Sequence, residues 1–202
     1  MFVNLFKGIF LSTLAVSLSI LLWSNFTINF IGFSVSLLSV TFGLLSSAIS
    51  EEILFRFIIF ELLIKRCRFE IALIIESLIF SLAHYTTSVD LIALIGYFLG
   101  GVNYTLAYVL LKKTSKIYSQ SMRLLKKISL PIGLHLGWNC SQSILFGLKT
   151  ENYGYKTSIF SVDLLGEDLF TGGNYGYEGG LIQLIARILV LLYLLYVFTK
   201  QN

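Results

Sequence analysis

The stretch Ser50-Glu51-Glu52-Ile53-Leu54-Phe55-Arg56 places two carboxylates and a guanidinium inside an apolar run over residues 31–64. Charged side chains are unfavourable in a membrane or a protein core unless they are paired. On a helix, Glu52 and Arg56 lie four residues apart on one face and can form an ion pair. Glu51 is turned about 100° away from Glu52 and lacks such a partner. We interpret Glu52 and Arg56 as a structural pair and Glu51 as a functional carboxylate; the alternative is a salt bridge with Glu51 as a bystander.

The composition indicates an integral membrane protein. Of 202 residues, 56% are hydrophobic and 13% are charged, whereas soluble domains carry about 25% charged residues. The apolar stretches do not alternate with polar residues as the strands of a membrane β-barrel do. The sequence therefore predicts an all-α fold, a polytopic transmembrane helical bundle that forms one domain over residues 1–202.

The apolar segments predict about six membrane spans. They lie at about residues 8–24, 33–64, 69–85, 91–111, 128–148 and 181–198. The second is longer than the ~30 Å core of a bilayer requires, so it is either one long tilted helix or two helices broken near residues 46–50. In the fourth, Gly96 and Gly100 form a small-xxx-small pair that permits close helix contact. In the fifth, we expect Pro131 to mark the start of the helix.

The basic residues are distributed unevenly between the two sides of this topology. With the N-terminus in the cytoplasm, the cytoplasmic segments hold eleven of the fifteen Lys and Arg residues, six of them in the loop 112–127. The loop 149–178 carries five acidic residues and falls outside. Cytoplasmic loops of membrane proteins are enriched in Lys and Arg, so we predict a cell-membrane protein with both termini in the cytoplasm. The partner predicted for the basic loop is an anionic lipid surface and not a nucleic acid.

Polar side chains from three spans complete a candidate site with Glu51. The chain has two histidines: His84 ends the third span, and His135 shares a helix face with Asn139 in the fifth. Either histidine alone is also typical of a helix–helix hydrogen bond. Together with a carboxylate, an imidazole can activate water, and imidazole with carboxamide can donate hydrogen bonds to a developing oxyanion.

Counting residues along straight helices places Glu51 and His135 at different depths in the membrane. Glu51 lies about 21 Å from Lys65, whereas His135 lies only about 12 Å from Lys127 at 1.5 Å per residue. A tilt, a break near Ser50 or a linker before the fifth helix is needed to bring Glu51 and His135 together.

Two further charges fall inside predicted spans. Glu76 and Arg187 either pair with each other, or Glu76 faces the pocket, and the sequence leaves both possibilities open. Metal chemistry is a further alternative, because two histidines and a glutamate are ligands that zinc accepts. No His-Glu-x-x-His spacing is present, so we expect no metal and rank zinc second.

Three short motifs occur in a fixed order, each in an apolar segment. They are Glu51-Glu52-x-x-x-Arg56, Phe80-x-x-x-His84 and His135-x-x-x-Asn139. In this order they resemble the motifs of the CPBP family, the CAAX-protease and bacteriocin-processing (Abi) family of intramembrane glutamic endopeptidases. The resemblance covers about residues 47–148. It implies that Glu52 and Arg56 hold the architecture of the site.

The resemblance also implies an activity and a role for each remaining motif residue. The activity is hydrolysis of a peptide bond without a covalent intermediate or a cofactor, on a peptide or protein substrate such as a bacteriocin precursor. Glu51 would be the general base on water, helped by His84. His135 and Asn139 would form the oxyanion hole.

The sequence departs from the family pattern at two positions, and two other functions stay open. Phe57 stands where many relatives have Gly, and Glu76 stands where a small or apolar residue is usual. Members of the family are associated with self-immunity, so a non-enzymatic immunity protein that binds its target through the same pocket is one alternative. A small transporter with an intramembrane proton relay is the other, although the inverted repeat common in transporters is not visible.

Overall fold

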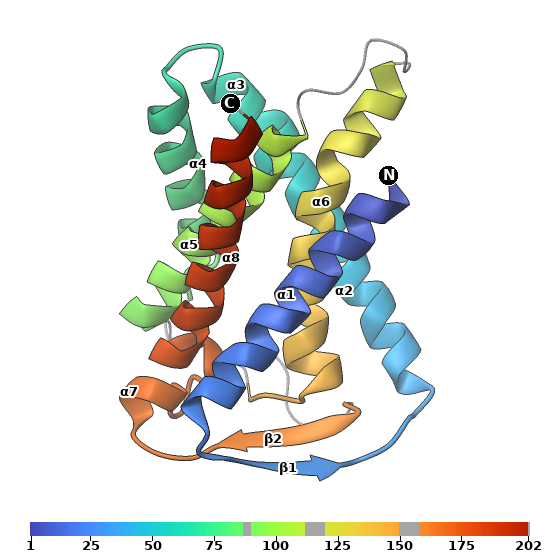
Figure 1. Ribbon diagram of the computed structural model, residues 1–202, viewed down its shortest axis with the longest axis vertical. Coiled ribbons are helices and arrows are strands. Elements are labelled where there is room, and N and C mark those ends of the chain that lie inside the picture. The colour runs from blue at the N-terminus through green and yellow to red at the C-terminus, as the bar shows by residue number, and fades with distance from the viewer. Residues whose placement is uncertain (87–89, 112–119, 150–157, 202) are drawn as a thin grey trace.

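The computed structural model describes residues 1–86, 90–111, 120–149 and 158–201, and these form a bundle of helices with a two-stranded sheet at one end (Figure 1). The helices are α1 (Phe2–Trp23), α2 (Ser36–Glu52), α3 (Glu61–Leu63), α4 (Phe69–Ala83), α5 (Leu91–Leu110), α6 (Gln120–Cys140), α7 (Asp168–Thr171) and α8 (Leu181–Gln201). The π-helical segments η1 (Ile53–Phe60) and η2 (Ser141–Leu145), the 3-10 turn η4 (Tyr177–Gly179) and the strands β1 (Phe26–Phe30) and β2 (Phe160–Leu164) complete the fold.

The predicted all-α membrane bundle is confirmed. Among the described residues, four helices are long and apolar enough to cross a membrane: Phe2–Trp23, Ser36–Leu63, Leu91–Leu110 and Leu181–Lys200. The third predicted span corresponds to α4, whose 15 residues are fewer than the about 20 that a full crossing needs. The fifth corresponds to α6, which begins in the basic segment of the sequence.

Residues 36–63 form one continuous helix and are not broken near residues 46–50. The backbone is α-helical up to Glu52, where α2 ends, and π-helical over η1. The helix that carries Asn139 changes in the same way, because η2 follows α6 directly. Single stretches of π-helix inside α-helices occur frequently at functional sites. Both changes here come just after residues of the candidate site.

The prediction that Pro131 starts the fifth helix is wrong. Helix α6 begins at Gln120 and contains Pro131 in its interior; neighbouring helices can satisfy the backbone groups that a proline leaves free in a membrane bundle. The helix continues past Lys127, and Nζ of Lys127 lies 3.4 Å from Oε1 of Glu61. Glu61 is about 15 Å along its helix from Glu51, at 1.5 Å per residue. This is close to the about 12 Å between Lys127 and His135, so Lys65 was the wrong reference for the comparison of depths.

Glycines set the closest helix contacts. A Cβ added at Gly133 or Gly137 of α6 would lie less than 3.0 Å from backbone atoms of α1. On α5, a Cβ at Gly100 would lie 2.8 Å from Nη1 of Arg187 in α8. The Gly96–Gly100 pair thus does permit a close contact, and it is with α8. The glycines of α6 thus allow a short distance between the axes of α1 and α6.

The strands β1 and β2 join two loops that are far apart in the sequence. They pair antiparallel, from Phe26 opposite Leu164 to Phe30 opposite Phe160. Both chain ends lie at the opposite end of the bundle from this sheet (Figure 1). These two loops, both outside in the predicted topology, therefore share one end of the molecule. Residues 112–119 of the predicted basic loop and residues 150–157 of the predicted acidic loop lie outside the described residues.

Candidate active site

A cavity of about 200 Å³ opens between α2, α4, α5, α6 and α8. All four predicted catalytic residues, Glu51, His84, His135 and Asn139, line it. Among the described residues, the lining consists of Leu44, Ser47, Glu51, Phe80, His84, Tyr97, Tyr104, His135, Asn139, Gln142, Ser143, Glu178 and Arg187. The structure therefore brings the predicted residues together from three helical segments, while their catalytic roles stay a prediction.

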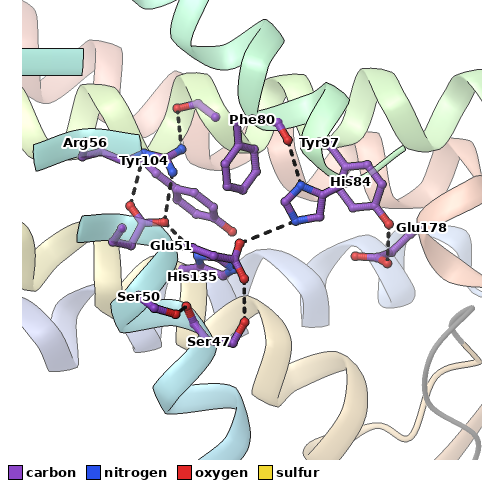
Figure 2. A network of polar contacts seen from close by, with 12 residues as sticks. Ser47, Ser50, Glu51, Arg56, Phe80, His84, Tyr97, Tyr104, His135 and Glu178 are labelled. Carbon is purple, nitrogen blue, oxygen red and sulfur yellow. Dashed lines mark hydrogen bonds and ion pairs between the residues drawn. The ribbon is translucent and has the colours of Figure 1, made fainter. Parts of the chain in front are cut away.

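The two oxygens of Glu51 have different surroundings. Oε1 accepts a hydrogen bond of 2.5 Å from the hydroxyl of Ser47, one helical turn earlier. Oε2 lies 3.6 Å from Nε2 of His84 and 3.8 Å from Nε2 of His135 (Figure 2). Oε2 is buried and has no hydrogen-bond partner among the described residues. Oε1 thus anchors the side chain through Ser47, and Oε2 lies between the two imidazoles without a hydrogen bond.

His84 is oriented by the backbone of its own helix. Its Nδ1 lies 2.8 Å from the carbonyl oxygen of Phe80 (Figure 2). A carbonyl oxygen only accepts hydrogen bonds, so Nδ1 carries a hydrogen, and in the neutral form of the ring Nε2 faces Glu51 with its lone pair. The ring stacks on Tyr97, with centroids 4.6 Å apart. These contacts fix both the direction of the ring and its tautomer.

His135 is oriented by a carboxylate. Its Nδ1 lies 2.8 Å from Oε1 of Glu52, and its ring stacks on Tyr104 at 4.9 Å. An ionised carboxylate also only accepts hydrogen bonds, so Nδ1 donates and Nε2 faces the cavity. Nε2 can donate a hydrogen bond only when the ring carries a second proton. His135 therefore acts as an acceptor toward the cavity in its neutral form and as a donor when it is an imidazolium.

The ion pair expected between Glu52 and Arg56 is present and extends to a third residue. Nε of Arg56 lies 3.2 Å from Oε2 of Glu52, and Nη2 lies 3.6 Å from Oε1 of Glu76. All three side chains have an exposed fraction of 0%. The guanidinium also lies over the ring of Phe80, 4.4 Å from its centre. Arg56 thus ties α2 and η1 to α4 behind the cavity.

Glu76 and Arg187 do not pair with each other. Glu76 uses one oxygen for Arg56 and accepts a hydrogen bond of 2.6 Å from Thr105 with the other. It is absent from the cavity lining, so both possibilities left open for it are wrong. Arg187 does line the cavity. Phe57 is 41% exposed and is also absent from the lining.

Several residues of the cavity were missed in the sequence. Glu178 comes from η4, in the loop predicted to be outside, and its Oε2 accepts a hydrogen bond of 3.0 Å from Tyr97. Nothing in the local sequence distinguishes Glu178 from the other acids of that loop. Ser47 was detectable, because it precedes Glu51 by four residues and the two share a helix face. Tyr97 and Tyr104 sit in an apolar helix, where aromatic residues are expected without a function.

Within the described parts of the chain, no group of three or more His, Cys, Asp or Glu residues is arranged to hold a metal ion. Cys67 and Cys140 are free thiols.

Comparison with known proteins gives one match. A family model described as type II CAAX prenyl endopeptidase Rce1-like matches residues 32–141. No curated protein and no solved structure matches the chain. The matched segment contains all three motifs and covers more than half of the 202 residues. This membrane protein therefore belongs to the Rce1-like family of type II CAAX prenyl endopeptidases.

Proposed function

We propose that the protein is an intramembrane glutamic endopeptidase, in which Glu51 activates water to hydrolyse a peptide bond. Membership of a CAAX-type endopeptidase family supports the reaction class. The observation that carries the glutamate mechanism is the position of Glu51 Oε2, which has no hydrogen-bond partner and lies 3.6–3.8 Å from the Nε2 atoms of His84 and His135.

In the first step, Glu51 takes a proton from a water molecule beside Oε2. The water oxygen bonds to the carbonyl carbon of the substrate, and the π electrons of the carbonyl group move onto the carbonyl oxygen, which becomes the oxyanion. Nε2 of His84 accepts a hydrogen bond from the second O–H of the water, which keeps that hydrogen, and so orients the water toward the carbonyl. A general base placed in this way contributes typically 10²–10⁴-fold to the rate.

In the second step, the oxyanion is stabilised by hydrogen bonds from the Asn139 amide and from Nε2 of His135. His135 donates from Nε2 as an imidazolium, while its Nδ1–H donates a hydrogen bond to Oε1 of Glu52. The carbon–nitrogen bond then breaks, and the proton held by Glu51 passes to the leaving amine. Water is consumed, and the products are a carboxyl terminus and an amino terminus. No covalent intermediate or cofactor is needed.

The substrate class that we propose is a peptide or protein reaching the cavity from the membrane, such as a bacteriocin precursor or signalling peptide. A role in self-immunity is compatible with this activity. The competing non-enzymatic role, a binder that uses the same pocket, predicts that Glu51 is dispensable. These two functions are therefore separated by one substitution.

The test is cleavage of an internally quenched peptide library by purified protein in detergent, with Glu51→Gln as the variant. Glu70→Gln is the matched control, because Glu70 is an exposed acid of α4 whose side chain is 64% accessible. We expect cleavage by the wild type and the control and none by Glu51→Gln, with all three equally folded. Equal cleavage by Glu51→Gln contradicts the proposal. Loss of cleavage with a chelator and its recovery with zinc would replace it by a metal mechanism.

A further inference from the structure

Arg187 is a buried cation in the active-site cavity without an acidic partner. It lies in the second turn of α8, six residues after Leu181, is 4% exposed and lines the cavity. Among the described residues, no carboxylate oxygen lies within 4.0 Å of its guanidinium. Arg56, the other arginine inside the bundle, has two carboxylates within that distance. The two buried arginines therefore differ: the charge of Arg56 is paired with carboxylates, and the charge of Arg187 is not.

Neutral groups hold the Arg187 guanidinium in place. Nη1 donates a hydrogen bond of 2.9 Å to the hydroxyl of Tyr104, and the guanidinium carbon lies 3.4 Å from the ring centre of Trp138. Gly100 leaves the space that Nη1 occupies, because a Cβ there would lie only 2.8 Å from it. Nε is buried and has no hydrogen-bond partner in the described residues. The group is thus positioned, but its charge and one of its donors are unmatched.

The nearby acids are committed to other groups. Glu178 lines the same cavity, and Tyr97 donates to its Oε2. With the Gln142 amide oriented so that its oxygen accepts from Trp138, its nitrogen donates to the other oxygen of Glu178 at 3.3 Å. Glu52 is shared by Arg56 and His135. A buried cation left without a partner is strongly destabilising, and an ionisable group at membrane depth usually marks a functional site.

We propose that Arg187 is a specificity-determining residue that binds a carboxylate of the substrate. This inference rests on the proposed peptidase function of the same cavity. Guanidinium groups favour carboxylates because their planar donors match the two oxygens. The carboxylate is the C-terminal group of the peptide or an acidic side chain close to the scissile bond. Arg187 lies beyond residues 32–141, so the family match does not assign it.

The position of Arg187 relates this subsite to the reacting centre. Tyr104 accepts the hydrogen bond from Arg187 and stacks on His135 with an interplanar angle of 12°. One side chain therefore separates the guanidinium from the imidazole proposed to stabilise the oxyanion. A bound carboxylate would fix the register of the peptide, so that only bonds at a set distance from it reach Glu51.

The experiment compares three peptides of one sequence that the wild type cleaves. They carry a free C-terminal carboxylate, a C-terminal amide, or a C-terminal amide with one acidic side chain near the terminus. We expect kcat/KM to be at least ~10-fold higher for one of the two acidic peptides than for the neutral amide, as for one charge-assisted hydrogen bond in a buried site. Which acidic peptide is preferred distinguishes the two sources of the carboxylate. Equal kcat/KM for all three contradicts the proposal without any variant.

The variant Arg187→Gln should abolish this preference, so that the ratio of kcat/KM for the acidic peptide to kcat/KM for the amide falls to about one. Arg187→Lys should keep part of the preference, because it keeps the charge. Arg68→Gln is the matched control, since Arg68 is an exposed arginine with 81% of its side chain accessible. A preference that persists in folded Arg187→Gln also contradicts the proposal.

Binding can be measured separately from cleavage. The chain has two tryptophans, and Trp23 stacks on Phe170 outside the cavity lining. In protein carrying Trp23→Phe and Glu51→Gln, the fluorescence of Trp138 reports directly on the guanidinium above it. We expect it to change with the acidic peptide and not with the amide. Selective binding without cleavage in the wild type would retain the carboxylate site and reject the peptidase. Cleavage by the wild type with equal binding of both peptides would retain the peptidase and reject the carboxylate site.

Discussion

Glu52 Oε1 lies 2.8 Å from Nδ1 of His135 and 3.3 Å from Nη1 of Arg56, so one buried carboxylate serves both an imidazole and a guanidinium. Breaking a buried ion pair by removing one partner typically costs about 3–5 kcal/mol. We expect Glu52→Ala and Arg56→Ala to lower the amount of folded protein in the membrane as well as activity. Thermal unfolding in detergent and membrane abundance measure this. Normal abundance and activity in both variants would show that the pair is dispensable.

Ser47 should matter for activity more than for stability. Its hydroxyl donates to Oε1 of Glu51, and a hydrogen bond to a charged group is worth about 1.5–3 kcal/mol. Ser47→Ala should therefore lower kcat by roughly tenfold or more and leave the folded protein intact. Ser50→Ala is the control, because the Ser50 hydroxyl bonds only to backbone carbonyls of its own helix among the described groups. Equal kcat values for the two variants would exclude an anchoring role for Ser47.

Asn139→Ala should reduce activity without abolishing it. Removing one oxyanion-hole donor typically lowers kcat by about 10²–10³-fold. Glu51→Gln removes the base itself and should leave no measurable turnover. Asn29→Ala in the exposed strand β1 provides a control for the loss of an amide. The measurement is kcat on one peptide at saturation, and an Asn139→Ala variant with wild-type kcat would remove Asn139 from the oxyanion hole.

Two glycines allow the helix packing to be tested with one type of substitution. A Cβ at Gly133 would overlap the backbone of Leu5 in α1, whereas a Cβ at Gly43 would meet no atom within 4 Å. Overpacking a close contact costs typically about 1–3 kcal/mol. Gly133→Ala should therefore lower the unfolding temperature, and Gly43→Ala should leave it unchanged or raise it slightly because alanine favours helix. An equal effect at both sites would show that the α1–α6 contact is not tight.

The predicted topology can be tested by reporter fusions after residues 30, 66, 165 and 202. The pairing of β1 with β2 requires residues 30 and 165 to be on the same side. From the distribution of Lys and Arg, we expect both to report the outside, and residues 66 and 202 to report the cytoplasm. A cytoplasmic signal at 165 would contradict the predicted orientation. Different signals at 30 and 165 would contradict the strand pairing itself.

The sequence by itself determined what depends on local spacing and composition. The apolar segments located the helices because a membrane or core requires runs of apolar residues at helical length. The pair Glu52–Arg56 was visible because residues four apart share a helix face. The same periodicity placed His135 beside Asn139, and the order of the three motifs indicated the family. Apart from the order of the motifs, each of these inferences uses only neighbours along the chain.

The tertiary structure decided every relationship that depends on the position and rotation of one helix relative to another. The sequence placed Pro131 at a helix start and left open whether Glu76 pairs with Arg187 or faces the pocket. Neither the first turn of α6 nor the facing guanidinium of Arg56 is encoded in local spacing. The strand pairing joins segments more than 100 residues apart in the same way. A Cβ at Gly133 would lie less than 3.0 Å from the backbone of Leu5, so this glycine lets α1 and α6 pack closely. Packing between whole helices places Nε2 of His135 3.8 Å from Oε2 of Glu51. No short stretch of sequence specifies such a position.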